Sequence, residues 1–301
     1  MSICQFKLTD IPQVMQHIGW NQARRLMLRW FNSPPYELPM EYKLGKKSAS
    51  SLPQEHVLSD LPFAWLRTSS ARVAPRIDEL VRQLTTVVED DDFVGRDAGA
   101  WFDQLTNGLL QILRRLDHLG AIDHSAKSFL PKSFDFSARS AVQLDANSQF
   151  NFITIGSSVG ERTTDELDDV YGALGQFLIK VAFTRASTYV DSMGFSVLQI
   201  DEIGLYARDT YEFHGDNLLG YWSNEGVVKP SLTNIDGHKP FEDRNGIRYW
   251  RVMDSDFNEY RRIYKRGRDF MVFSTVERHP VYIAIHLRPV DFMEYEARKG
   301  Q

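Results

Sequence analysis

The densest group of reactive side chains lies within one eight-residue segment. It contains Asp209, Tyr211, Glu212, His214 and Asp216. Carboxylates can hold a divalent metal ion, and histidine exchanges protons near neutral pH. We therefore predict catalytic roles for Asp209, Tyr211, Glu212 and His214. The predicted metal ligands are Asp209, Glu212 and Asp216.

The spacing of these residues sets a geometric condition. Asp209 and Glu212 are three residues apart, so on an extended strand their side chains would point to opposite faces. Converging on one ion requires the chain to turn, and Gly215 tolerates the positive φ of a turn. A magnesium ion held there would keep several waters and leave room for a phosphate. The alternative is a polar turn whose carboxylates accept backbone hydrogen bonds while Tyr211 packs in the core.

A basic cluster near the C-terminus is a second candidate site. It comprises Arg261, Arg262, Lys265, Arg266 and Arg268, with Tyr260 and Tyr264 among them. Basic and aromatic side chains together can bind a phosphate backbone. They can equally complement the C-terminal end of a helix dipole. The chain has 35 basic and 40 acidic residues, and this net charge of -5 makes nucleic acid an unexpected partner.

Several classes of protein are disfavoured. The single cysteine, Cys4, cannot form an intramolecular disulfide. The chain has no P-loop, G-x-S-x-G, H-E-x-x-H or G-x-G-x-x-G motif. No basic region followed by an apolar stretch opens it, and no run approaches the roughly 18 apolar residues of a membrane span. We expect a protein made in the cytoplasm, whose secretion would need a route that reads no signal peptide.

The hydrophobic pattern predicts an α+β fold. Helical spacing dominates residues 9–32 and 74–120, whereas later segments alternate with a period of two. Successive strands with few helices between them favour antiparallel pairing. We expect a helical N-terminal layer packed on a mostly antiparallel, twisted C-terminal sheet that could close toward a barrel.

Composition suggests three parts. Residues 1–62 form an N-terminal helical hook and a mobile connector rich in proline and serine. Residues 63–125 form a helical hairpin, and residues 126–301 form a β-rich domain with one or two short helices. We predict partner-binding roles for Arg24, Arg25, Arg29 and Trp30 on an arginine-rich helix at 22–31. The alternative is an amphipathic helix packed on the body.

Two resemblances to known families suggest a biological context. The stretches 10–20, 27–31, 168–175, 203–213 and 219–222 together resemble an uncharacterised bacterial family. That family is associated with type VI secretion and interbacterial toxin gene clusters. The resemblance implies a partner that is another protein of the secretion or toxin cluster.

A shorter stretch is similar to the Asp-x-Tyr-Asp-Phe motif of colicin M-type bacteriocins, which are magnesium-dependent enzymes that cut a lipid-linked peptidoglycan precursor. The matching residues are Asp209, Tyr211 and Glu212, although Glu212 replaces an aspartate. The family's His-Arg pair corresponds here to Leu218 and Leu219.

These resemblances imply a component of a type VI secretion-type antibacterial system, either a toxin or its directly bound partner. With magnesium as the cofactor, it could be a metal-dependent phosphodiesterase acting on a cell-envelope precursor. The alternative is a non-catalytic adaptor or immunity protein that binds a toxin.

Overall fold

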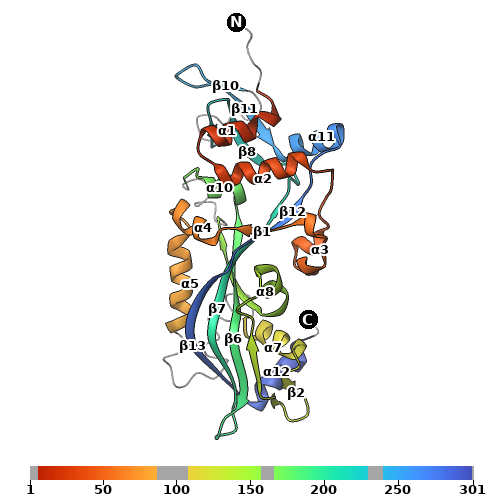
Figure 1. The fold of residues 1–301 in the computed structure, drawn as a ribbon, viewed down its shortest axis with the longest axis vertical. Coiled ribbons are helices and arrows are strands. Elements are labelled where there is room, and N and C mark those ends of the chain that lie inside the picture. The colour runs from red at the N-terminus through yellow and green to blue at the C-terminus, as the bar shows by residue number, and fades with distance from the viewer. Residues whose placement is uncertain (1–5, 87–107, 157–165, 230–239, 300–301) are drawn as a thin grey trace.

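One long, curled sheet runs through most of the molecule, and helices pack at its ends and sides (Figure 1). The computed structural model describes residues 6–86, 108–156, 166–229 and 240–299. The α+β class is as predicted, with mixed, half-barrel sheets that are mostly antiparallel. No helix in these ranges combines the length and apolar character needed to cross a bilayer.

The main sheet has the strand order β1-β12-β7-β6-β4, with β13 also paired to β7 and β5 to β6. Its strands are β1 (Val57–Leu61), β4 (Lys132–Asp135), β5 (Gln149–Ile155), β6 (Phe177–Val190), β7 (Ser196–Tyr211), β12 (Phe270–Ser274) and β13 (Glu277–Leu287). The pairing of β1 with β12 is parallel, and the other pairings are antiparallel. Because β7 is long, its first part pairs with β13 and its last part with β12.

A smaller sheet lies beyond the end of β7. It has the order β10-β11-β8-β9 and contains β8 (Leu218–Trp222), β9 (Val227–Val228), β10 (Phe241–Glu242) and β11 (Arg248–Met253). The strands β2 (Ile122–Asp123) and β3 (Ser128–Phe129) form a separate hairpin. The chain passes from the main sheet to the smaller one through residues 212–217.

The helices are α1 (Ile11–His17), α2 (Asn21–Asn32), α3 (Met40–Lys43), α4 (Phe63–Ser69), α5 (Ala74–Thr86), α7 (Gly108–His118), α8 (Ala141–Asn147), α10 (Asp169–Leu174), α11 (Asp254–Tyr264) and α12 (Pro289–Arg298). Short 3-10 helices cover Leu8–Asp10, Ala49–Ser51 and Gln54–His56. The helix predicted to begin near residue 254 is confirmed as α11.

Helix α2 is anchored at both ends. Asp169 of α10 accepts hydrogen bonds from the backbone N–H groups of Gln22 (3.0 Å) and Ala23 (2.8 Å), which lie in the first turn of α2. At the other end, Trp30 is fully buried. Its ring occupies the space that a Cβ at Gly267 would need, so glycine permits this close approach. The expected helical N-terminal layer is therefore docked on the rest of the molecule.

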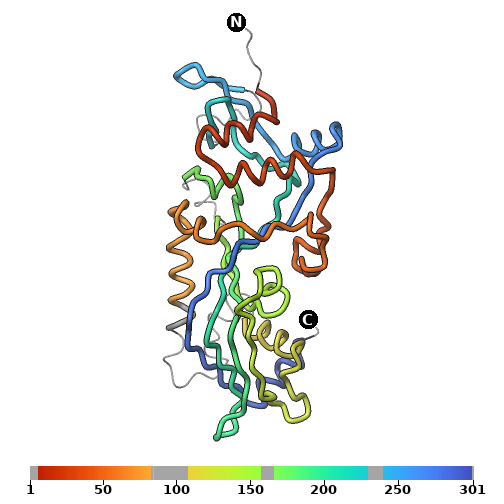
Figure 2. The backbone as a smooth tube through the Cα atoms, in the orientation of Figure 1, coloured from red at the N-terminus to blue at the C-terminus, as the bar shows by residue number. Residues whose placement is uncertain are grey.

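Two features expected from the sequence differ in the structure. Residues 57–61, assigned from the sequence to the mobile connector, form β1 and enter the main sheet beside β12 (Figure 2). The two helices of the expected hairpin contact different elements. Helix α5 contacts β13, whereas α7 contacts β5 and α12, so the two helices pack apart. The connection between them lies outside the described residues. The division into three domains stays a prediction.

Candidate functional site

The candidate site lies where the chain leaves β7 for β8. A polar cleft of about 730 Å³ opens there. Its polar side chains come from Lys43, Arg72, Thr154, Gln176, Arg208, Asp209, Thr210, Glu212, His214, Asn217 and Asp254. The end of β7, the crossing segment and the last residue of α3 thus bring charged groups from distant parts of the chain to one place.

Glu212 and His214 meet a third residue, Asp269, just before β12. His214 Nε2 lies 3.8 Å from Glu212 Oε2 and 3.4 Å from Asp269 Oδ2. Each of the three side chains can offer one ligand atom, and these atoms lie within 4.8 Å of one another. We call Glu212, His214 and Asp269 the inner cluster.

Asp269 is completely buried and held by several donors. Trp30 Nε1 donates to its Oδ1 at 3.3 Å, and the backbone N–H of Leu38 donates to its Oδ2 at 3.2 Å. The guanidinium of Arg261, itself only 6% exposed, forms an ion pair with the same carboxylate. This charge pairing is what allows a carboxylate to remain in the interior.

In Glu212, burial and charge pairing shift the pKa in opposite directions. Lys43 forms an ion pair with its carboxylate, and the Lys43 side chain is only 7% exposed. Burial nevertheless raises the pKa of Glu212, with Lys43 and His214 opposing that shift. Asp254, at the start of α11, also has a pKa raised by burial, although Asn217 donates to it at 2.7 Å. Two carboxyl groups of the cleft therefore favour the protonated form more than usual.

Asp209 and Tyr211 lie on β7 and face a second, apolar space. Burial raises the pKa of Asp209 well above its ordinary range. In the described part of the chain, no lysine, arginine or histidine nitrogen lies within 4.0 Å of its carboxylate. The Tyr211 hydroxyl donates to the Met27 sulfur at 3.6 Å, and its ring stacks on Phe270. Burial also raises the pKa of Tyr211.

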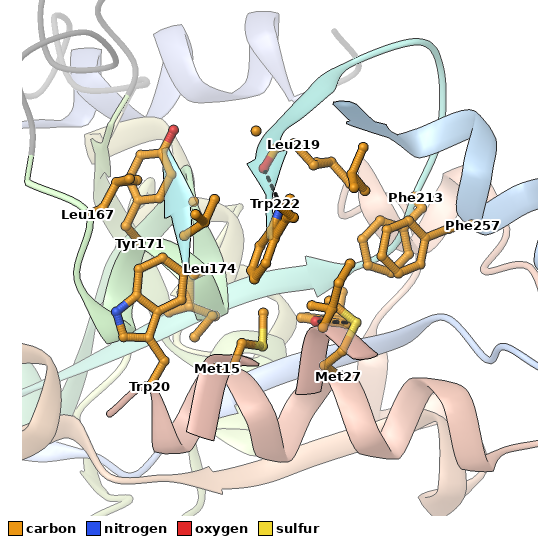
Figure 3. A pocket seen from close by; sticks show the side chains of 18 of the residues that line it. Met15, Trp20, Met27, Leu167, Tyr171, Leu174, Phe213, Leu219, Trp222 and Phe257 are labelled. Carbon is orange, nitrogen blue, oxygen red and sulfur yellow. Dashed lines mark hydrogen bonds between the residues drawn. The ribbon is translucent and has the colours of Figure 1, made fainter. Parts of the chain in front are cut away.

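The apolar space is a cavity of about 240 Å³ next to the cleft. Its side chains shown in Figure 3 come from Met15, Trp20, Met27, Leu167, Tyr171, Leu174, Phe213, Leu219, Trp222 and Phe257. Asp209, Thr210 and Glu212 line both the cavity and the cleft. The two spaces therefore share a border at the end of β7.

The predicted metal ligands do not gather as one group. Glu212 belongs to the inner cluster, whereas Asp209 lies at the border of the cavity and Asp216 is exposed on the turn before β8. The structure instead adds His214 and Asp269 to Glu212. The roles of Asp209, Glu212 and Asp216 as metal ligands stay predictions.

The predicted partner-binding residues mostly make contacts within the chain. Arg25 pairs with Asp60 at 2.9 Å. Arg29 donates to the carbonyl oxygens of Glu55 and Val57. Trp30 is fully buried, so another protein would reach it only after α2 moved.

Arg24 is half-buried beside them. A partner-binding role for these four residues stays a prediction.

A family model matches residues 6–287 of the chain. Its description is "Family of unknown function (DUF6402)". The chain belongs to the DUF6402 family. Searches of curated proteins and of solved structures found no match.

In this DUF6402 chain, the sequence did not single out Lys43, Asp254 or Asp269 as site residues. Arg261 was considered only as part of a basic surface, but it points inward to Asp269, while Arg262 and Lys265 are exposed. A buried arginine needs a carboxylate partner, and Asp269 directly precedes the apolar strand β12. An aspartate directly before a core strand was therefore the sequence signal that could have indicated Asp269 as a site residue.

A second group of the same composition lies near the opposite end of the main sheet. Asp117 of α7, His124 and Glu296 of α12 place potential ligand atoms within 4.8 Å of one another. We call these three residues the outer cluster. Its histidine is 48% exposed and bridges the two carboxylates through opposite ring nitrogens.

Proposed function

We propose that this protein is a hydrolytic toxin of a type VI secretion-type antibacterial system, which cuts a phosphate ester or pyrophosphate of a cell-envelope precursor. The observation that supports the hydrolytic part is the inner cluster, a histidine and two carboxylates beside a polar cleft of about 730 Å³. The antibacterial setting is supported by the sequence resemblance over 10–20, 168–175 and 203–213.

The inner cluster has the donors for a divalent ion. A histidine nitrogen with two carboxylates is more typical of Mn²⁺ or Zn²⁺ than of Mg²⁺, which prefers oxygen ligands. Lys43 would have to withdraw from Glu212 when the ion binds, because its ammonium group occupies that carboxylate. When bound, such an ion stabilises negative charge that develops on the phosphoryl oxygens.

The protein groups would supply positioning and a proton. In hydrolysis a water oxygen bonds to phosphorus, one P–O ester bond breaks, and the leaving oxygen takes a proton. Asp254 lines the cleft, is coupled electrostatically to His214 and has a raised pKa, so we assign the proton donation to it. The catalytic roles predicted for Asp209 and Tyr211 stay predictions, because both residues line the cavity.

The test of hydrolysis uses bis(4-nitrophenyl) phosphate with Mn²⁺, Zn²⁺, Mg²⁺ or no added metal. We expect metal-dependent release of 4-nitrophenol by the wild type. His214→Asn and Glu212→Gln should each lower the rate about 100-fold. Asp201→Asn is the matched control, because Asp201 is an exposed aspartate on β7, and it should retain the rate. Full activity in folded His214→Asn would reject the inner cluster as the site.

The antibacterial role is tested by measuring toxicity. The protein is expressed in the cytoplasm of a susceptible bacterium and, with an export signal, in its periplasm. Growth arrest that Glu212→Gln relieves and Asp201→Asn does not would support the toxin. Harmlessness in both compartments would reject it.

A non-catalytic adaptor or immunity protein is the second candidate. The observation that favours it is the pairing of the two carboxylates with Lys43 and Arg261, which satisfies the inner cluster without a metal ion. Such a protein would be harmless when expressed alone, would bind the product of a neighbouring toxin gene in a pull-down, and would protect cells that express that toxin.

A further inference from the structure

The cavity beside the cleft combines aromatic walls with two acidic groups at its border. Trp20, Tyr171, Tyr211 and Trp222 contribute to its lining. So do Asp209 and Glu212, of which Glu212 is already paired with Lys43. Its volume of about 240 Å³ exceeds the roughly 150 Å³ that suffices for a benzene molecule. The cavity is therefore large enough for a substituted ring or a short branched chain.

Asp209 lacks the cation partner that Glu212 and Asp269 have. Glu212 has Lys43, and Asp269 has Arg261, whereas the carboxylate of Asp209 has no basic nitrogen within 4.0 Å in the described ranges. A buried carboxylate without a counter-charge is unfavourable unless it is protonated or meets a cation. This is consistent with the raised pKa of Asp209.

The aromatic walls can attract a cation, which is the kind of group that Asp209 lacks. Ring faces stabilise organic cations, most strongly where water is excluded. Lys229 already uses this interaction, with Nζ 4.7 Å from the ring centre of Tyr171. Met15 and Met27 give the opposite wall flexible, polarisable side chains that adapt to ligand shape.

We propose that the cavity binds a small organic amine with an apolar body, whose ammonium group pairs with Asp209 while the body packs among the aromatic and methionine side chains. This site borders the inner cluster at Glu212, which lines both the cavity and the cleft, but it does not depend on the proposed hydrolysis.

Three probes of similar size separate charge from shape. They are 2-phenylethylamine, 2-phenylethanol and 3-phenylpropanoate, and binding is followed by calorimetry and by the fluorescence of Trp20 and Trp222, which line the cavity. We expect the amine to bind at least about tenfold more tightly than the alcohol, and the carboxylate to bind most weakly. Equal affinity for amine and alcohol would overturn the proposal.

Variants locate the binding site. Asp209→Asn should lower the affinity for the amine to that for the alcohol, while Asp201→Asn, the same change at an exposed position of the same strand, should leave it unaltered. Val227→Phe narrows the cavity and should weaken both the amine and the alcohol about tenfold. Val281→Phe is its control, since both valines are partly buried on strands but only Val227 lines the cavity.

One result would contradict the assignment to this cavity. It is amine binding that Asp209→Asn and Val227→Phe both leave unchanged.

Discussion

The inner and outer clusters have the same chemical composition, one histidine and two carboxylates, but different surroundings. In the outer cluster His124 Nε2 lies 2.9 Å from Asp117 and Nδ1 lies 2.6 Å from Glu296, and water reaches all three side chains. In the inner cluster Asp269 is fully buried, and the histidine is 34% exposed.

The comparison shows what burial demands of a charged group. The inner carboxylates have cations from separate elements, Lys43 and Arg261, whose own side chains are almost buried. The outer carboxylates depend on the exposed side chains of His124 and Lys299, where solvent screens charge. Asp117 also accepts a hydrogen bond from the buried Tyr295 hydroxyl. Composition alone therefore does not distinguish a candidate site from a surface ion pair, but burial and the neighbouring cleft do.

The largest expected effect is that of breaking the inner ion pair. Asp269→Asn leaves the Arg261 charge buried without its partner and should lower the free energy of unfolding by about 3–5 kcal/mol. Urea denaturation monitored by circular dichroism measures this change. A loss below about 1 kcal/mol would mean that the inner cluster is as well solvated as the outer one.

The second prediction concerns Lys43. Lys43→Met removes the counter-charge of Glu212 and should destabilise the protein by about 1–3 kcal/mol. It should also tighten Mn²⁺ or Zn²⁺ binding, because the ion no longer competes with the ammonium group. Calorimetric titration of wild type and variant decides between the two proposed functions, since unchanged or absent metal binding favours the non-catalytic one.

The third prediction uses opposite pKa shifts. Burial raises the pKa of Asp209, so the unfolded state binds fewer protons above its usual value of 3.8, and stability falls as the pH rises. For Asp117, burial acts upward, but hydrogen bonds from Tyr295 and His124 outweigh it and lower the pKa. The contribution of Asp117 to stability is present above its ordinary pKa of 3.8 and is lost as the pH falls through the lowered pKa.

Denaturation curves from about pH 2 to about pH 8 test these slopes. Asp209→Asn should gain stability relative to the wild type as the pH rises. Asp117→Asn should be less stable than the wild type near neutral pH, and the difference should disappear in acid. Slopes of the same sign in the two variants would show that one of the shifts has been assigned wrongly.

The smallest expected effect is in the outer cluster. Glu296→Gln should leave the free energy of unfolding almost unchanged, because Glu296 and His124 are well exposed. Added salt should reduce this difference further. A cost similar to that of Asp269→Asn would remove the distinction between the clusters.

Local patterns predicted much of the fold. The helical spacing of Ala23, Leu26, Met27 and Trp30 corresponds to the buried face of α2, and the alternation after Phe177 corresponds to β6. The segments 195–200 and 203–207 read as two strands because Asp201 and Glu202 interrupt the apolar residues. They form one strand, since Asp201 is exposed and Glu202 accepts a hydrogen bond from Thr184 on β6.

The site was predictable only where its residues are close in sequence. Glu212 and His214 stood out because they lie in one dense segment. Asp269, just before β12, and Lys43, at the end of α3, reach the same point from distant parts of the chain, and no local pattern indicates such long-range convergence. The strand β1 was missed for a similar reason, since five residues in a proline-rich stretch pair with β12 far along the chain.

The hydrogen bond from Trp30 to Asp269 joins residues 239 positions apart. Contacts of such high sequence separation form late, because a long loop must close before they can stabilise the chain. During synthesis, which proceeds from the N-terminus, α2 emerges long before β12 exists. The inner cluster therefore cannot assemble until Asp269 has left the ribosome, so an unfinished chain lacks the site, and full-length protein should recover it slowly after dilution from denaturant.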